Sequence, residues 1–177
     1  MTSLGKMACN QFLKLGLVGL GVGMFAATSA LAAPAPLFEP ILDELATSKF
    51  PVRLPTAVPA DVALYPSVRQ IRADIHILTV GVTPDCTGER CLGFNIVTIP
   101  EPGPWPAADN RLTPITPVVL GNGIQGYSAE ARGFASVEWM QDGSLYILNY
   151  STTLLSTEDA IAMATSMATE PPVSEAQ

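Results

Sequence analysis

The chain has 177 residues, enough for one domain, and carries nine basic against sixteen acidic residues, a formal net charge of −7 at pH 7. This acidic balance argues against binding to nucleic acid or to anionic lipid through a basic surface. Hydrophobic residues make up 48% of the chain, so we expect a sizeable apolar core.

The first 32 residues have the three parts of a secretory signal peptide. Lys6 and Lys14 supply positive charge, an uninterrupted apolar run covers 15–25, and Ala30-Leu31-Ala32 supplies an A-x-A cleavage site. We therefore expect a mature chain that starts near Ala33 and is extracytoplasmic, either periplasmic or secreted. The alternative is a retained membrane anchor, since the apolar and small-residue stretch reaches about 18 residues. Only in that case would the protein contact the membrane through this segment.

The cysteines predict one disulfide bond. Cys9 precedes the apolar run and leaves with the signal, so Cys86 and Cys91 are an even pair in an exported chain. A turn-forming Thr87-Gly88 lies between them and favours a short closed loop. A redox pair or half of a metal site are the alternatives, although the spacing is C-x4-C and the chain has a single histidine.

The segment 33–66, here called the N-terminal segment, contains seven prolines and excludes long regular structure. Pro40 is suited to the first position of one short helix that buries Ile41, Leu42 and Leu45. We expect the rest to be an extended wrap that packs Val52 and Leu54 on the body of the protein.

Four strands are predicted between residues 67 and 129. They cover 67–82, 91–99, 115–120 and 124–129, and the first two are expected to pair across the disulfide loop. In the first, His76 alternates with Arg72 and Asp74 on a polar face, which predicts a solvated histidine. Prolines at 114 and 117 predict that the third strand is an edge strand or a bulged one. The four prolines in 100–106 predict an extended surface loop.

The sequence 134–150 predicts a β-hairpin whose turn is Asp142-Gly143, because Asp-Gly tolerates the positive φ angles of a type I′ turn. This turn pairs Trp139 with Tyr146. Side chains of directly paired residues share a face, so one face of the hairpin is apolar throughout and should be core. That face carries Ala135, Val137, Trp139, Tyr146, Leu148 and Tyr150.

Ser156 and Asp159 have the spacing of a helix N-cap and its third residue, which predicts a helix from about 157 to 169. Residues 170–177 are expected to be a frayed tail. The predicted fold class is α+β: a curved antiparallel sheet of about six strands in meander order, with the C-terminal helix packed on one face. The predicted domain covers 67–169.

Several motifs are weak candidates for chemistry. Residues 121–126 satisfy G-x-G-x-x-G, but no helix pattern follows, so a hairpin turn is favoured over a dinucleotide site. His76 could serve Ser67 or Ser128 as a general base, yet no nucleophile motif accompanies either serine. No pattern brings together the carboxylates Glu130, Glu138 and Asp142 for glycoside chemistry, or Asp85 and Glu89 for calcium. We therefore predict no catalytic residue, no cofactor and no metal site.

Two aromatic residues are not assigned to the core by the pairing argument. Trp105 lies in the Pro-rich loop, and Tyr127 lies in the strand after the glycine-rich turn. These two are the candidate ligand contacts.

The stretch from about 118 to 169 resembles a bacterial family of extracytoplasmic domains of unknown function, also found in anti-sigma-factor-like proteins and in lipoproteins. The resemblance rests on the glycine-rich turn 121–126, on Ser136-Val137-Glu138-Trp139, on Asp142-Gly143 with Leu145-Tyr146, and on Ser156-Thr157-Glu158-Asp159. It implies no catalytic residues.

The sequence thus favours a non-catalytic exported module that binds an envelope protein or an apolar ligand. The alternative hypothesis is a secreted hydrolase whose site the sequence does not reveal.

Overall fold

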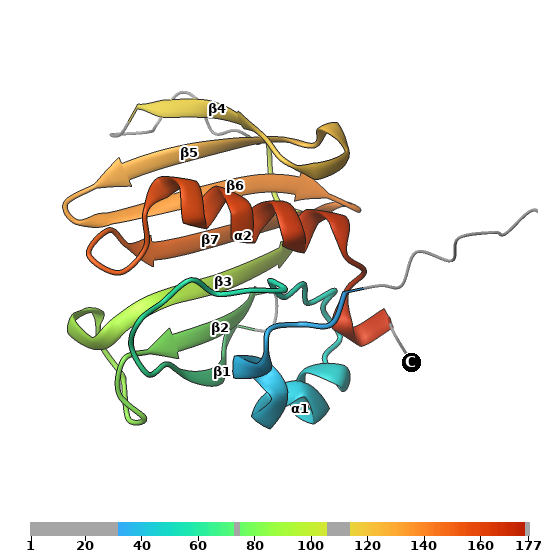
Figure 1. Cartoon of the computed structure of the whole chain (residues 1–177). Helices are drawn as coiled ribbons and strands as arrows, with labels where there is room; N and C mark the ends of the chain where they lie inside the picture. Colours follow the sequence, from blue (N-terminus) through green and yellow to red (C-terminus); the bar gives the residue numbers. More distant parts are fainter. Residues whose placement is uncertain (1–31, 73–74, 106–113, 176–177) are drawn as a thin grey trace, which may run out of the picture. The chain divides into compact units, whose positions relative to one another are not determined.

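The computed structural model describes residues 32–72, 75–105 and 114–175, so the predicted signal peptide lies almost wholly outside the described part. Its body is one open antiparallel sheet of seven strands in the order β1-β2-β3-β7-β6-β5-β4 (Figure 1). The strands are β1 (Tyr65–Arg72), β2 (Ile75–Gly81), β3 (Leu92–Pro100), β4 (Ile115–Val119), β5 (Gln125–Ala131), β6 (Phe134–Gln141) and β7 (Ser144–Ser151).

The prediction of six strands was wrong because the stretch 67–82 folds into two strands, not one. β1 and β2 pair antiparallel, with Tyr65 opposite Gly81 and Arg72 opposite Ile75. Strands in globular proteins rarely exceed ten residues, and the apolar alternation that continues through both strands concealed the reversal between them. The expected pairing of β2 with β3 across the disulfide loop is present.

The strand order also departs from the predicted meander. β3 pairs with β7, and the chain after β3 crosses to the far edge of the sheet, where β4 lies (Figure 1). A tight hairpin from β3 to β4 is incompatible with the prolines at 100, 102, 104, 106 and 114 in this connection. β4 is an edge strand, as its own prolines predicted.

The hairpin of β6 and β7 has the predicted register, with Trp139 opposite Tyr146 and Gln141 opposite Ser144. Asp142 and Gly143 have φ angles of 50° and 75°, as a type I′ turn requires. All six side chains of the predicted core face are buried. Trp139 and Tyr146 stack with ring centroids 5.4 Å apart at the turn end of this face.

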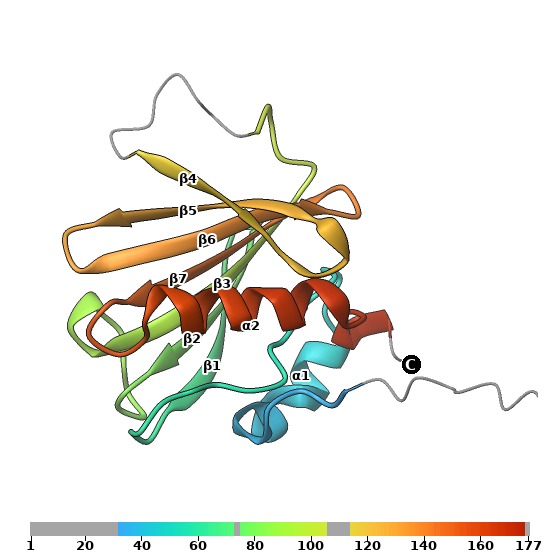
Figure 2. The same cartoon turned by 45° about the horizontal axis from the view of Figure 1, so that its top comes forward.

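Helix α2 (Thr157–Thr169) begins with the predicted capping box, in which the Ser156 hydroxyl accepts from the Asp159 amide and the Asp159 carboxylate accepts from the Ser156 amide. It lies over β6 and β7 (Figure 1) and buries Ala160, Met163, Ala164, Met167 and Ala168. The N-terminal segment packs on the same face of the sheet, so that a single core joins all three parts (Figure 2). No helix in the described ranges has the length and apolar character needed to cross a bilayer.

The N-terminal segment begins with a 3-10 turn, η1 (Pro36–Ile41), which leads into the short helix α1 (Leu42–Ala46). Leu45 is fully buried, and Val52 and Leu54 are buried as predicted. Residues 170–175, here called the C-terminal segment, were expected to fray. Instead the Val173 amide donates to the Val52 carbonyl at 2.7 Å, and a final turn, η5 (Val173–Glu175), forms.

Arg53 joins the N-terminal segment to α2 and to the β6–β7 turn. Its side chain is only 6% exposed and donates to the carbonyls of Met167 and Glu170 at the end of α2. It also binds the Asp142 carboxylate at 2.7 Å, and its guanidinium lies 5.8 Å from the centre of the Tyr146 ring. The last carbonyls of a helix have no partner within the helix, so Arg53 supplies donors where they are needed.

Candidate functional site

Cys86 and Cys91 form the predicted disulfide between β2 and β3, with Cα atoms 5.5 Å apart. Among the described residues, no group of three or more His, Cys, Asp and Glu side chains is close enough to hold a metal ion.

Trp105 and Tyr127 lie against each other, with ring centroids 5.2 Å apart in an edge-to-face arrangement. The Trp105 indole donates to the Glu138 carboxylate at 3.3 Å. Tyr127 on β5 is opposite Glu138 on β6. Glu138 directly precedes Trp139, so its side chain is on the opposite face of the sheet from Trp139. Both aromatic residues therefore lie on the outer face of the sheet, opposite α2. Their role as ligand contacts stays a prediction.

The other predicted candidates are not brought together. Ser67 pairs with Thr79 on the outer face, whereas His76 faces α1 on the other side of the sheet. Ser128 and Glu130 line a separate cavity near the start of α2. Asp142 binds Arg53 at the turn that follows β6. Glu130 on β5 lies near the other end of β6, opposite Ala135.

The glycines at 121–126 are required for close packing and for a turn. A Cβ atom at Gly121 would lie 2.1 Å from the Thr169 side chain, and one at Gly126 would lie 2.7 Å from the Glu138 carbonyl oxygen. The turn joins β4 to β5, and Asn122 adopts a φ of 59° within it. The hairpin-turn interpretation of this motif is confirmed.

The prediction that His76 is solvated was wrong. The side chain is 4% exposed, and its ring lies 5.7 Å from the Phe50 ring of the N-terminal segment. No local pattern indicates that this segment covers β2, so the polar residues near His76 predicted an exposed face. His76 is opposite Thr98 on β3, and the buried atoms His76 Nδ1 and Thr98 Oγ1 have no hydrogen-bond partner within the described residues.

His76 lines a cavity of about 560 Å³, here called the histidine cavity. The other lining residues come from β1 and from the end of α1 and the residues after it: Val68, Glu44, Thr47, Ser48, Lys49 and Phe50. Burial lowers the pKa of His76 below its ordinary value of 6.5, because the apolar surroundings disfavour the charged imidazolium. A neutral imidazole has one hydrogen-bond donor and one acceptor.

The lowered pKa of His76 makes stability pH-dependent. The unfolded chain takes up a proton near pH 6.5, before the folded chain does. The stabilisation linked to His76 should be complete above pH 6.5 and should be lost as the pH falls from 6.5 through the lower folded-state pKa. Urea unfolding at about pH 7.5 and about pH 5 checks this. His76→Gln should lose less stability between the two conditions, and equal losses would refute the assignment.

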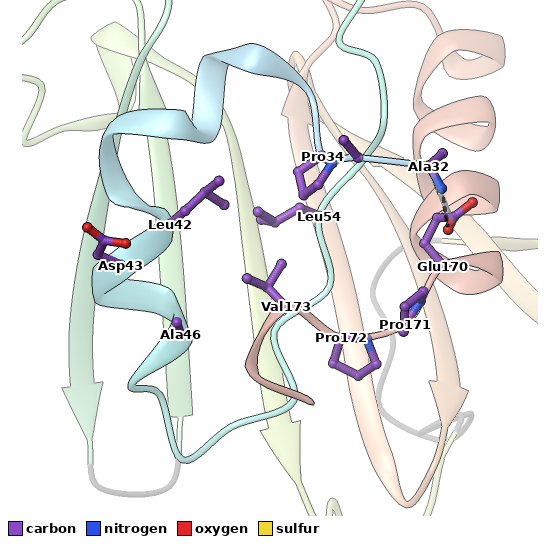
Figure 3. Close-up of a pocket in the computed structure, with 11 residues that line it drawn as sticks. Ala32, Pro34, Leu42, Asp43, Ala46, Leu54, Glu170, Pro171, Pro172 and Val173 are labelled. Carbon is purple, nitrogen blue, oxygen red and sulfur yellow. Dashed lines mark hydrogen bonds between the residues drawn. The ribbon is translucent and has the colours of Figure 1, made fainter. Parts of the chain in front are cut away.

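A second cavity, here called the apolar cavity, has a volume of about 370 Å³ and lies where the N-terminal and C-terminal segments meet (Figure 3). Leu42 from α1, Leu54 from the wrap and Val173 from η5 point toward one another across it (Figure 3). Ala and Pro residues complete the walls: Ala32, Ala33, Pro34, Ala46, Pro171 and Pro172. Helix α1 separates the two cavities, since Leu42 and Ala46 face this one while Glu44 and Thr47 face the histidine cavity.

Hydrogen bonds from several elements fix the walls of the apolar cavity. The Ala35 amide donates to the Pro55 carbonyl at 2.9 Å, which joins the beginning of the N-terminal segment to a later part of it. Val173 is held by Val52, and the Ser174 hydroxyl donates to the Phe50 carbonyl at 3.0 Å. Ala32 donates its amide to the Glu170 carboxylate at 3.1 Å (Figure 3). These hydrogen bonds hold the segments that line the cavity in place.

Sequence reasoning missed this cavity because its walls come from segments separated by more than a hundred residues. The residues 170–173, Glu-Pro-Pro-Val, are typical of a disordered end when considered alone. The one available signal was the apolar content of the N-terminal segment, which predicted docking but not a cavity.

Comparisons with family models, with curated proteins and with solved structures found no match to this chain.

Proposed function

We propose that this protein is a non-catalytic exported module that holds an apolar ligand in the cavity between α1 and the C-terminal segment. The observation that carries this proposal is the cavity itself. Its volume of about 370 Å³ is within the range of small-molecule sites, and nine of its eleven lining residues are Ala, Pro, Leu or Val.

The remaining features support a binding role in the cell envelope. The disulfide is compatible with an oxidising compartment outside the cytoplasm. His76, the one candidate general base, contacts Phe50 and faces away from Ser67, the serine on the neighbouring strand. These features favour binding over the hydrolase alternative.

A cavity-filling substitution tests this proposal. Ala46 lines the apolar cavity and is half-buried at the end of α1, so Ala46→Phe should place a ring in the ligand space. We expect the affinity for the neutral fluorescent probe N-phenylnaphthylamine to fall about tenfold or more, which corresponds to about 1.4 kcal/mol. The measurement is a fluorescence titration of the purified protein.

Ala162→Phe is the matched control, because Ala162 is exposed on α2 and lines none of the cavities described here. It should bind the probe as the parent protein does. Unfolding curves for both variants show whether each is folded. Equal probe affinity in folded Ala46→Phe and in the parent would refute the site, as would a parent protein that binds no probe.

A further inference from the structure

We propose, on the basis of the apolar-ligand function above, that the occupant of the apolar cavity is an amphiphile with a cationic amine head group, and that Glu170 binds this head. The apolar walls would hold its chain.

Charge at the rim favours a cation. The charged side chains that line the cavity are Asp43 and Glu170, both acidic, and they lie on opposite sides of it (Figure 3). Within the described residues the one salt bridge joins Arg53 to Asp142, so neither rim carboxylate is paired with a cation there. An anionic head group such as a carboxylate would meet two like charges in a chain of net charge −7.

Arg53 does not neutralise the rim even though it precedes Leu54. Its guanidinium donates to the backbone carbonyls of Glu170 and Met167 and to Asp142, and it does not line the cavity. Arg53 therefore contacts the backbone of Glu170, and its ion pair is with Asp142 and not with the Glu170 carboxylate.

The hydrogen-bonding groups near Glu170 also favour a cationic head group. Pro171 and Pro172 have no amide hydrogen, and neither has Pro34. A carboxylate accepts several hydrogen bonds, so Glu170 can accept from an ammonium group. A donating head group is therefore complementary to the Glu170 carboxylate, and an accepting one is not.

The test compares three ligands with one chain and different heads: decylamine, decanol and decanoate. Each displaces N-phenylnaphthylamine from the purified protein at neutral pH. We expect decylamine to bind about tenfold more tightly than decanol, and decanoate to bind more weakly than decanol. The preference for decylamine should shrink at high salt, because charge pairs at an open rim are screened.

Substitution of the rim carboxylates assigns the preference to a residue. Glu170→Gln should remove most of the preference for decylamine over decanol, and Asp43→Asn should remove less because Asp43 is exposed. Glu89→Gln, an exposed acid in the disulfide loop, is the matched control and should keep the preference.

The outcomes separate the two proposals. Equal affinity for all three heads, or a decylamine preference that survives Glu170→Gln, overturns the cationic-ligand inference and leaves the apolar site standing. Binding of none of the three ligands overturns both.

Discussion

Replacing Trp139 by alanine is expected to lower the free energy of unfolding by about 3–5 kcal/mol. Trp139 is fully buried near the turn end of β6 and stacks on Tyr146 with ring centroids 5.4 Å apart. Its indole also donates to Gln141, whose amide donates to the Ala168 carbonyl near the end of α2. The substitution therefore leaves a large cavity in the sheet and loosens the helix above it. Urea unfolding followed by far-ultraviolet circular dichroism measures the loss.

Trp105→Ala is the matched control for this prediction. Trp105 is half-buried on the outer face of the sheet, and its indole donates a hydrogen bond to Glu138 at 3.3 Å. We expect a loss of about 1 kcal/mol. Similar losses for the two tryptophan variants would contradict the assignment of the core to the α2 side of the sheet.

Replacing Arg53 by methionine is expected to cost about 2–4 kcal/mol of stability. Methionine keeps much of the apolar stem but removes every donor to the Met167 and Glu170 carbonyls at the end of α2. These carbonyls would lose partners in a site that is almost closed to water. Thermal and urea unfolding both measure the effect. Because Glu170 also borders the apolar cavity, the variant should bind N-phenylnaphthylamine more weakly as well.

Two controls distinguish helix capping by Arg53 from its ion pair. Asp142→Asn weakens only the ion pair, and the Asp142 side chain is 66% exposed, so the expected loss is below about 1 kcal/mol. Arg90→Met removes an exposed arginine in the disulfide loop and should be nearly neutral. A loss in Asp142→Asn as large as that in Arg53→Met would show that the ion pair, not the carbonyl bonds, stabilises this junction.

The sequence predicted those features of the fold that depend on residues close together in the chain. Asp142-Gly143 determined the turn and so the pairing of Trp139 with Tyr146, and Ser156 with Asp159 determined the start of α2. Each of these features involves residues within a few positions of one another. The same is true of the disulfide loop.

Features that depend on distant segments were not predictable in the same way. The reversal between β1 and β2 interrupts an apolar alternation that gives no turn signal, and the pairing of β3 with β7 joins strands about fifty residues apart. The burial of His76 depends on Phe50, and the apolar cavity depends on contact between residues 32–54 and 170–173. Such contacts follow from the whole fold rather than from local patterns.

The most direct test of the ligand-binding account is native mass spectrometry of the protein purified from the envelope of its own cells. We expect a retained apolar small molecule on the parent protein and on Ala162→Phe, and its loss from Ala46→Phe, because only the last substitution fills the apolar cavity. A ligand-free mass for the parent protein, or an equal ligand load on Ala46→Phe, would contradict the account.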